Sequence, residues 1–212
     1  MKLDTRWLGR ITFENALALQ DQLVAERAAP EPGAPVPPEV LLLLEHEPVY
    51  TIGRTPDQSS LRDAALLPHP VVQINRGGQA TYHGPGQLVG YPILRLSERG
   101  QDLHRYLREL EEALIELLAE YGVAAVRREG LTGVWVGERK IASIGVGVRK
   151  WISMHGFALN VCGDLTPFNQ ITPCGIAGVE MTNLERESGQ SVDVRSVADR
   201  VAVVFERRFF GK

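Results

Sequence analysis

The chain has 212 residues, of which 44% are hydrophobic and 23% are charged, and its formal net charge is −3. These proportions are typical of a globular protein with a substantial core, and the slight negative charge argues against a nucleic-acid-binding protein. The N-terminus lacks the apolar core of a signal peptide, and no apolar run approaches the roughly 20 residues of a membrane span, so we expect a cytoplasmic protein that does not bind membranes.

The first half of the chain predicts one helix and four strands. The helix begins near Thr12 and fades at Ala28 and Ala29. Five prolines follow between residues 30 and 38; because one helix is too little to form a domain, we expect a surface loop rather than a linker. Runs typical of strands cover residues 40–44, 49–52, 71–75 and 88–94.

A glycine-rich stretch separates the last two of these strands. It reads Arg76-Gly-Gly-Gln-Ala-Thr-Tyr-His-Gly-Pro-Gly-Gln87, and its glycines let the backbone approach a ligand closely. No Gly-Lys-Ser/Thr sequence ends it and no helix follows, which excludes a Walker loop and a dinucleotide fingerprint. A tight turn is the commoner use of such a stretch, but Arg76, Thr81, Tyr82 and His83 favour a polar-rimmed binding site. No ligand partner lies at metal spacing from His83, so we expect no metal site.

The second half of the chain predicts two more helices and four more strands. Apolar residues recur at intervals of three and four from Leu103 to Tyr121, with Asp102 as N-cap and Gly122 at the end. The other helix covers residues 194–209. Strands are expected at 122–126, 134–136, 141–148 and 152–161, and a hairpin turn at 137–139.

Cys174 lies in a turn-like segment, Ile171-Thr-Pro-Cys-Gly-Ile-Ala-Gly178. The proline before it and the glycine after it constrain the backbone and leave the sulfur open to a bulky electrophile. A helix that begins at Gly175 or Ile176 would also favour a thiolate. A small buried thiol in a loop explains this segment equally well on its own. The other cysteine, Cys162, is most simply a packing residue, since two cysteines at this spacing form neither a disulfide framework nor a zinc or CxxC motif.

Four segments together resemble the lipoyl/octanoyl transferase family, in the order that the family has them. They are the glycine-rich stretch 76–87, Gly137-Glu-Arg-Lys-Ile-Ala-Ser-Ile-Gly145, His155-Gly-Phe-Ala-Leu-Asn160 and Thr172-Pro-Cys-Gly-Ile176. The resemblance spans residues from about 40 to 185. Gln79 and Cys174 match the transferases. The related ATP-dependent lipoate ligases have a serine and three glycines in the glycine-rich loop and lack the cysteine.

This resemblance implies a fold and an activity. The fold is α/β, a mixed β-sheet flanked by helices of the biotin/lipoate protein ligase catalytic type, with residues 1–212 as a single domain. The activity is that of an acyltransferase, which moves an octanoyl group from acyl carrier protein to a lysine of a lipoyl domain. The implied acceptors are lipoyl domains of 2-oxoacid dehydrogenase E2 subunits and the glycine cleavage H protein. A thioester donor is already activated, so we expect no cofactor, neither ATP nor a metal.

The resemblance also implies a catalytic pair. In the family the cysteine of the Pro-Cys-Gly motif, here Cys174, carries the acyl group as a thioester, and the lysine of the Lys-Ile-Ala-Ser motif, here Lys140, assists proton transfer. An ammonium beside a thiol favours the thiolate, and a neutral Lys140 could accept the proton that the acceptor lysine must lose. Without the resemblance, Lys140 would be read as a solvated hairpin lysine.

Three segments correspond to the family's substrate contacts. Their small and apolar residues suit an eight-carbon chain, and backbone N–H groups near the carbonyl could stabilise an oxyanion. Phe157 replaces a frequent leucine and bears on the chain length accepted, whereas His155 is expected to be structural. The substrate-binding residues implied are Arg76, Gly77, Gly78, Gln79, Ala80, Thr81, Tyr82, His83, Ser143, Ile144, Gly145, Gly156, Phe157 and Ala158.

Three other functions compete with this one. They are an ATP-dependent lipoate or biotin ligase, an amidotransferase that takes octanoyl from one lipoyl-bearing protein to another, and a silent acyl-binding protein of the same fold. The presence of both Cys174 and Lys140 argues against the last. An assay with free octanoate and ATP distinguishes the first.

Overall fold

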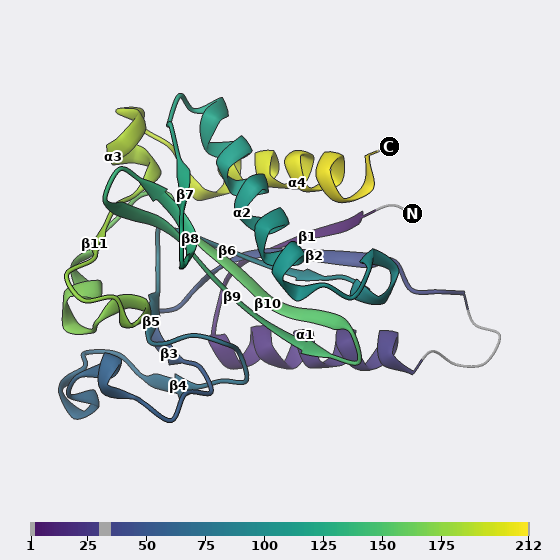
Figure 1. Cartoon of the computed structure of the whole chain (residues 1–212), viewed down its shortest axis with the longest axis horizontal. Helices are drawn as coiled ribbons and strands as arrows, with labels where there is room; N and C mark the ends of the chain where they lie inside the picture. The colour runs from purple at the N-terminus through teal and green to yellow at the C-terminus, as the bar shows by residue number, and fades with distance from the viewer. Residues whose placement is uncertain (1–2, 30–34, 212) are drawn as a thin grey trace.

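The computed structural model describes residues 3–29 and 35–211, which form two β-sheets and four α-helices (Figure 1). The helices are α1 (Phe13–Ala28), α2 (Leu103–Glu120), α3 (Leu184–Ser188) and α4 (Val194–Phe210). The strands are β1 (Leu3–Ile11), β2 (Glu39–His46), β3 (Val49–Ile52), β4 (Val71–Gln73), β5 (Thr81–His83), β6 (Gln87–Ile93), β7 (Val126–Arg128), β8 (Leu131–Val136), β9 (Arg139–Arg149), β10 (Ile152–Asn160) and β11 (Glu180–Met181).

The larger sheet is mixed. Its strands follow the order β1-β2-β6-β10-β9-β8-β7, and β11 pairs with the beginning of β9. β1 is parallel to β2 and β11 is parallel to β9, whereas the other neighbours are antiparallel. The smaller sheet has the order β4-β3-β5. The predicted fold class, a mixed sheet flanked by helices, is therefore confirmed.

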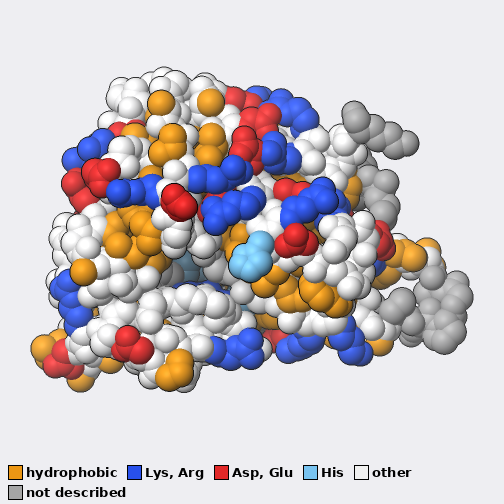
Figure 2. All heavy atoms as spheres, in the orientation of Figure 1, with side chains coloured by type: hydrophobic (Ala, Val, Ile, Leu, Met, Phe, Trp, Pro, Cys, Tyr) orange, Lys and Arg blue, Asp and Glu red, His pale blue; other side chains and the backbone are white. Residues whose placement is uncertain are grey.

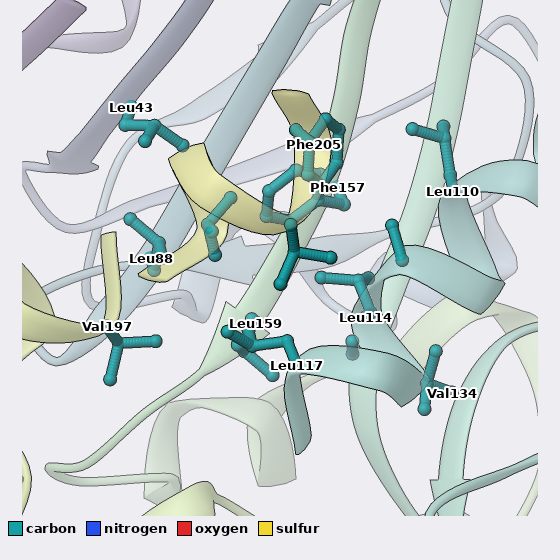
Figure 3. Packing of buried hydrophobic residues seen from close by; sticks show 14 of the residues in the cluster. Leu43, Leu88, Leu110, Leu114, Leu117, Val134, Phe157, Leu159, Val197 and Phe205 are labelled. Carbon is teal, nitrogen blue, oxygen red and sulfur yellow. The ribbon is translucent and has the colours of Figure 1, made fainter. Parts of the chain in front are cut away.

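Helices α2 and α4 cover one face of the large sheet and bury an apolar core against it (Figure 3). Successive strand residues point to opposite faces, so alternate residues of β2, β6 and β10 contribute to this core. In Figure 3, Phe157 of β10 lies against Phe205 of α4, with ring centroids 5.4 Å apart. The labelled core residues are Leu43, Leu88, Leu110, Leu114, Leu117, Val134, Phe157, Leu159, Val197 and Phe205.

Helix α1 and the smaller sheet lie on the opposite face of the large sheet (Figure 1). The intervening strand residues, such as Leu42 and Val89, pack there against Ala16, Leu23 and Val24 of α1. Small-sheet residues continue this layer through a separate cluster with Phe13. The functional site described below lies on this face.

The three long helices begin at the residues that the sequence predicts. Thr12, Asp102 and Asp193 each accept a hydrogen bond from a backbone N–H one turn later, at 3.3, 2.9 and 3.0 Å. An N-cap of this kind satisfies a donor that has no partner inside the helix. The predicted hairpin is also present, since Val136 of β8 pairs with Arg139 of β9.

The strand expected at 122–126 is wrong. Gly122 adopts φ +76°, and the N–H of Val123 donates to the carbonyl of Leu118 at 3.1 Å, so these residues close the end of α2. Val123 and Ala125 are buried as loop residues, which explains their apolar character, and β7 begins only at Val126.

Three strands were not expected from the sequence, namely β1, β5 and the two-residue β11. β1 is a partly exposed edge strand whose side chains do not alternate cleanly, and β5 lies inside the glycine-rich stretch. Pro35 and Pro38 lie on the surface as expected, while Pro30 and Pro32 fall outside the described residues. None of the helices in the described part of the chain has the length and apolarity needed to cross a membrane.

Candidate functional site

Side chains of β5, inside the glycine-rich stretch, point alternately to the two faces of the small sheet. Thr81 and His83 line a cavity between the two sheets, whereas Tyr82 packs in a separate apolar cluster with Tyr50 and Phe168. This division follows from the period of two in a β-strand. The carbonyl of Ala80, just before the strand, accepts the N–H of Cys174 at 2.8 Å. The stretch therefore contributes to the cavity and also holds the cysteine loop.

Cys174 sits on a tight turn with its backbone in the left-handed region. Its φ is +56° and that of Gly175 is +71°, inside a single 3-10 turn over Pro173–Gly175. No helix begins at Gly175 or Ile176, so the additional support that a helix N-terminus would give to a thiolate is not present there. The side chain of Gln79 packs so closely on Gly175 that a Cβ there would lie 2.8 Å from it. This contact and the Ala80 hydrogen bond fix the position of the thiol.

Lys140 is buried beside the thiol, with 1% of its surface exposed. Its Nζ lies 3.2 Å from Cys174 Sγ, and it donates to the carbonyl of Thr132 at 3.0 Å. The hydroxyl of Ser143 lies 3.6 Å from the same sulfur. A buried ammonium that points at a sulfur is not the solvated hairpin residue that Lys140 would be by itself. The structure thus brings together the two residues that the resemblance paired.

Two neighbouring elements hold Lys140 in place. The N–H of Thr182, after β11, donates to the carbonyl of Lys140 at 2.9 Å, which links the lysine to the segment that follows Cys174. On the neighbouring strand β8, Gly133 has φ +127° and leaves room for the lysine. A Cβ at this position would lie 2.7 Å from Lys140 Cε. The buried carboxylate of Glu111 on α2 accepts the N–H of Gly133 at 3.0 Å.

The other cysteine has the opposite surroundings. Cys162 follows β10 and packs against the large apolar core, as predicted. Burial, together with the nearby carboxylates of Glu185 and Glu45, raises the pKa of its thiol. A raised pKa disfavours the thiolate, so the surroundings of Cys162 do not favour a nucleophile.

The cavity has a volume of about 250 Å³. This is just below the roughly 300–1,000 Å³ of pockets for drug-sized ligands, and it suits a short chain. Gly77, Ala80 and Tyr82 are the predicted binding residues that do not line it. Its lining combines the predicted residues Arg76, Gly78, Gln79, Thr81, His83, Lys140, Ser143, Ile144, Gly145, Gly156, Phe157, Ala158 and Cys174 with Phe13, Ile74, Tyr91, Gly130, Leu131, Thr132, His155 and Ile176.

Phe157 lines the cavity, but its ring also packs away from it. It lies across Gly90 and packs on Phe205 in the core beneath α4. Sequence reasoning missed Phe13, Ile74 and Tyr91 because each comes from a different element and carries no local motif. Only Gly130, in the turn between β7 and β8, had a recognisable turn signal.

Arg76 crosses the middle of the site. Its Nη2 donates to the carbonyl and hydroxyl of Thr51 at 3.2 and 3.0 Å and to the carbonyl of Gln79 at 3.0 Å. Gly145 admits it, since a Cβ there would lie 3.0 Å from Arg76 Cδ. Burial lowers the pKa of Arg76, but a guanidinium keeps its charge at neutral pH. Arg76 therefore places a fixed positive charge on the cavity side of the glycine-rich stretch.

Three buried histidines surround the end of the cavity that Phe13 and Tyr91 line. Burial lowers the pKa of His46 and of His155 to about 4, and burial with the neighbouring His46 lowers that of His83 to about 3. All three are neutral at pH 7. His46 Nε2 bonds the hydroxyl of Tyr91 at 2.6 Å, and His83 Nδ1 bonds Gln87 Oε1 at 2.7 Å.

The arrangement is suited to acyl transfer. It supplies a nucleophilic sulfur, a buried ammonium within hydrogen-bond reach of it, and a cavity with small walls for a chain attached to that sulfur. Within residues 3–29 and 35–211, no three His, Cys, Asp or Glu side chains gather as a metal site. On the face visible in Figure 2, basic and acidic side chains are interspersed.

Residues 12–206 match the family model of the lipoyl protein ligase A/B catalytic domain. An octanoyltransferase from Geotalea uraniireducens is 55% identical over 199 residues, which are 94% of this chain and 89% of the relative. An octanoyltransferase from Geobacter metallireducens is 53% identical over 207 residues, which are 96% and 93% of the two chains.

A solved structure has the same fold. It belongs to a structural analysis of an archaeal lipoylation system from Thermoplasma acidophilum. That system consists of a bipartite lipoate protein ligase and its E2 lipoyl domain. The match has a TM-score of 0.68 at 18% identity and covers 99% of this chain and 84% of the other. At this identity the likeness concerns the fold alone.

Proposed function

The chain belongs to the lipoyl protein ligase A/B catalytic domain family and is an acyltransferase that moves octanoyl groups in protein lipoylation, and we propose that it does so through an octanoyl thioester on Cys174. Lys140 is the group that moves protons in this mechanism. The observation that carries the proposal is the 3.2 Å contact between a buried lysine nitrogen and a thiol at the end of an acyl-sized cavity.

In the first half-reaction Cys174 attacks the carbonyl carbon of an octanoyl thioester. The thiol gives its proton to solvent or to a neutral Lys140, and the resulting thiolate lies beside the lysine nitrogen. A carbon–sulfur bond to Cys174 forms, the bond to the donor's sulfur breaks, and the departing thiolate takes up a proton, which Lys140 can donate. The thioester is exchanged for another of similar energy, so no ATP is consumed.

In the second half-reaction the amine of an acceptor lysine attacks the thioester on Cys174. An ordinary lysine has a pKa of about 10.4 and is almost wholly protonated at neutral pH. The acceptor ammonium first loses one proton to solvent. Lys140, in its neutral form, removes the second proton as the nitrogen attacks, and that proton restores the thiol as the carbon–sulfur bond breaks. The product is an octanoyl amide on the acceptor.

We propose acyl carrier protein as the donor and lipoyl domains as acceptors, both of E2 subunits and of the glycine cleavage H protein. The octanoyltransferase relatives support the acyl group, and the archaeal ligase studied with its E2 lipoyl domain supports the acceptor class. The site also fits a single catalytic unit over residues 1–212, because its lining comes from α1, both sheets and the loop of Cys174. Limited proteolysis that releases a stable fragment with full activity would contradict this single unit.

One experiment distinguishes transfer from ligation. The protein is incubated with apo lipoyl domain and octanoyl-acyl carrier protein without ATP, and in parallel with free octanoate and ATP. We expect an octanoylated lipoyl domain, detected by mass, in the first mixture only. Product in the second mixture alone would identify an ATP-dependent ligase. Product only in a third mixture, with an octanoylated lipoyl domain as the donor, would identify an amidotransferase.

A further inference from the structure

His155 carries a polar ring to the wall of the cavity. The side chain is 2% exposed, and neither ring nitrogen makes a hydrogen bond of normal length and angle with the described residues. The backbone of Asn75 is the protein group nearest to partnering the ring, and it raises the pKa of the imidazole against the effect of burial. The residue lines the same cavity as Cys174. Leaving a buried donor and acceptor without partners costs free energy, so an imidazole placed this way indicates a polar occupant of the cavity.

The backbone of His155 is held in an unusual conformation. Its φ is +57° in the middle of β10, a region that non-glycine residues enter rarely and at a cost. Gln20 of α1, itself fully buried, accepts the N–H of His155 through its Oε1 at 2.7 Å. Strain of this kind persists only where the surroundings enforce it, and here they turn the imidazole to the cavity.

The position of His155 along the sheet corresponds to the end of an octanoyl chain. Ser143, 3.6 Å from the sulfur of Cys174, pairs with Ala158, whereas His155 pairs with Val146, three residues further along β9. Three strand residues span about 10 Å. An extended eight-carbon chain, with C–C bonds of about 1.5 Å, spans about 9 Å. A chain attached to Cys174 and extended along β9 therefore brings its last carbons to His155.

The tyrosine hydroxyl nearest to His155 is not free to bind a group in the cavity. The hydroxyl of Tyr91, whose ring centroid lies 6.3 Å away, is already bonded to His46. Burial and the charge of Arg76 lower the pKa of His155, so the ring is neutral at pH 7 and offers one donor and one acceptor.

On the basis of the acyl-enzyme proposed above, we propose that His155 is a specificity-determining residue that hydrogen-bonds a small polar group at the distal end of the acyl cavity. With an octanoyl chain this group is a buried water molecule. With a chain that bears a hydroxyl on carbon 8, the hydroxyl takes the place of the water. A longer hydrocarbon chain must instead displace the water and leave the imidazole unsatisfied.

The wild-type enzyme tests this with three carrier-protein thioesters: octanoyl, 8-hydroxyoctanoyl and decanoyl. We expect the hydroxylated chain to react within about fivefold of octanoyl in kcat/KM, because His155 satisfies its hydroxyl. Decanoyl should be worse than octanoyl by at least about tenfold, since the polar end rejects two more methylenes. An apolar pocket would disfavour the hydroxylated chain by about a hundredfold, and that result would overturn the proposal. Equal rates for all three chains would also overturn it, because the tail would then lie in an open groove.

Two variants add an independent test. His155→Phe keeps a planar ring without nitrogens, and His155→Asn keeps a side chain that tolerates positive φ but is shorter. We expect either variant to lower the 8-hydroxyoctanoyl to octanoyl ratio by at least about tenfold, whereas His104→Phe, at an exposed histidine of α2, should leave it unchanged. If a variant fails to fold, the wild-type ratios decide. Absence of any octanoyl transfer by the wild type would refute the proposed function rather than the role of His155.

Discussion

The two faces of the large sheet are built from the same strands but bury different kinds of side chain. On the α2 and α4 face, residues such as Leu114, Leu159 and Val201 are fully buried in an almost wholly apolar core. The face turned to α1 and the small sheet buries charged and polar groups, including Lys140 and Arg76, around a cavity.

Six described non-glycine residues have positive φ, and the four that lie outside the site are exposed. Two buried or half-buried residues of the site, His155 and Cys174, adopt positive φ although they are not glycines. Such conformations cost of order 1–3 kcal/mol each and persist where the rest of the fold supplies the stability. The α2 and α4 face therefore stabilises the fold, while the other face holds reactive groups in positions that are unfavourable on their own.

The largest expected effect separates chemistry from stability. Cys174→Ser should lower kcat/KM by about 10⁴-fold or more, because a hydroxyl near neutral pH is a far poorer nucleophile than a thiolate. The melting temperature should change little, and Cys162→Ser should keep full activity. Steady-state assays and thermal melts check both variants. Substantial turnover by the Cys174 variant would show that this thiol is not the nucleophile.

Acidification should destabilise the cavity face. In the folded protein the pKa values of His46 and His155 are lowered to about 4 and that of His83 to about 3. The unfolded chain binds these protons below about pH 6.5, so stability is complete above that pH and is lost as pH falls. Each histidine should remove about 2 kcal/mol between pH 7 and pH 5.

Urea unfolding at the two pH values measures this loss. Carboxylates with a lowered pKa, such as Glu187, lose their stabilising effect only at lower pH, so they do not contribute between pH 7 and 5. Equal free energies of unfolding at pH 7 and pH 5 would show that the buried histidines titrate normally.

A substitution that removes apolar contacts beneath α2 should lower stability and leave activity nearly unchanged, the reverse of the expectation for Cys174→Ser. Leu114→Ala, at a fully buried position of α2, should lower the free energy of unfolding by about 2–5 kcal/mol. Because Leu114 packs on the far side of the sheet, kcat/KM of the folded fraction should stay within about twofold of wild type. A large loss of activity at full folding would mean that the two faces are coupled.

The smallest expected effect tests the partner of the thiol. Lys140→Ala should slow transfer by at least about tenfold, and Lys140→Arg should restore little, since a guanidinium cannot accept a proton. Iodoacetamide should also label Cys174 more slowly at pH 7 in the alanine variant, because the neighbouring ammonium is gone. Unchanged labelling and transfer would make the lysine a structural residue.

The apolar face could be predicted from the sequence far better than the cavity. The spacing of Leu110, Leu114 and Leu117 fixes the buried side of α2 without any knowledge of the fold. The pairing of Cys174 with Lys140 came from a family motif, and the structure places the two atoms in contact.

The geometry of the cavity could not be predicted, because it depends on contacts between distant elements. The positive φ of Cys174 depends on the Ala80 carbonyl and on Gln79, which lie in another part of the chain. Phe13 and Tyr91 reach the cavity from α1 and β6, and neither stands in a motif. The strand expected at 122–126 failed for a related reason, since buried loop residues have the same apolar pattern as a strand.

Mass spectrometry shows directly whether Cys174 carries the acyl group. The protein is mixed with octanoyl-acyl carrier protein, quenched at low pH, weighed intact and then mapped by peptides, with and without hydroxylamine. We predict one octanoyl group per chain, on Cys174, removed by hydroxylamine as a thioester is. Two results would show that Cys174 is not the acyl carrier. One is an adduct on Cys162 or Lys140, and the other is product formation under single-turnover conditions in which Cys174 is never acylated.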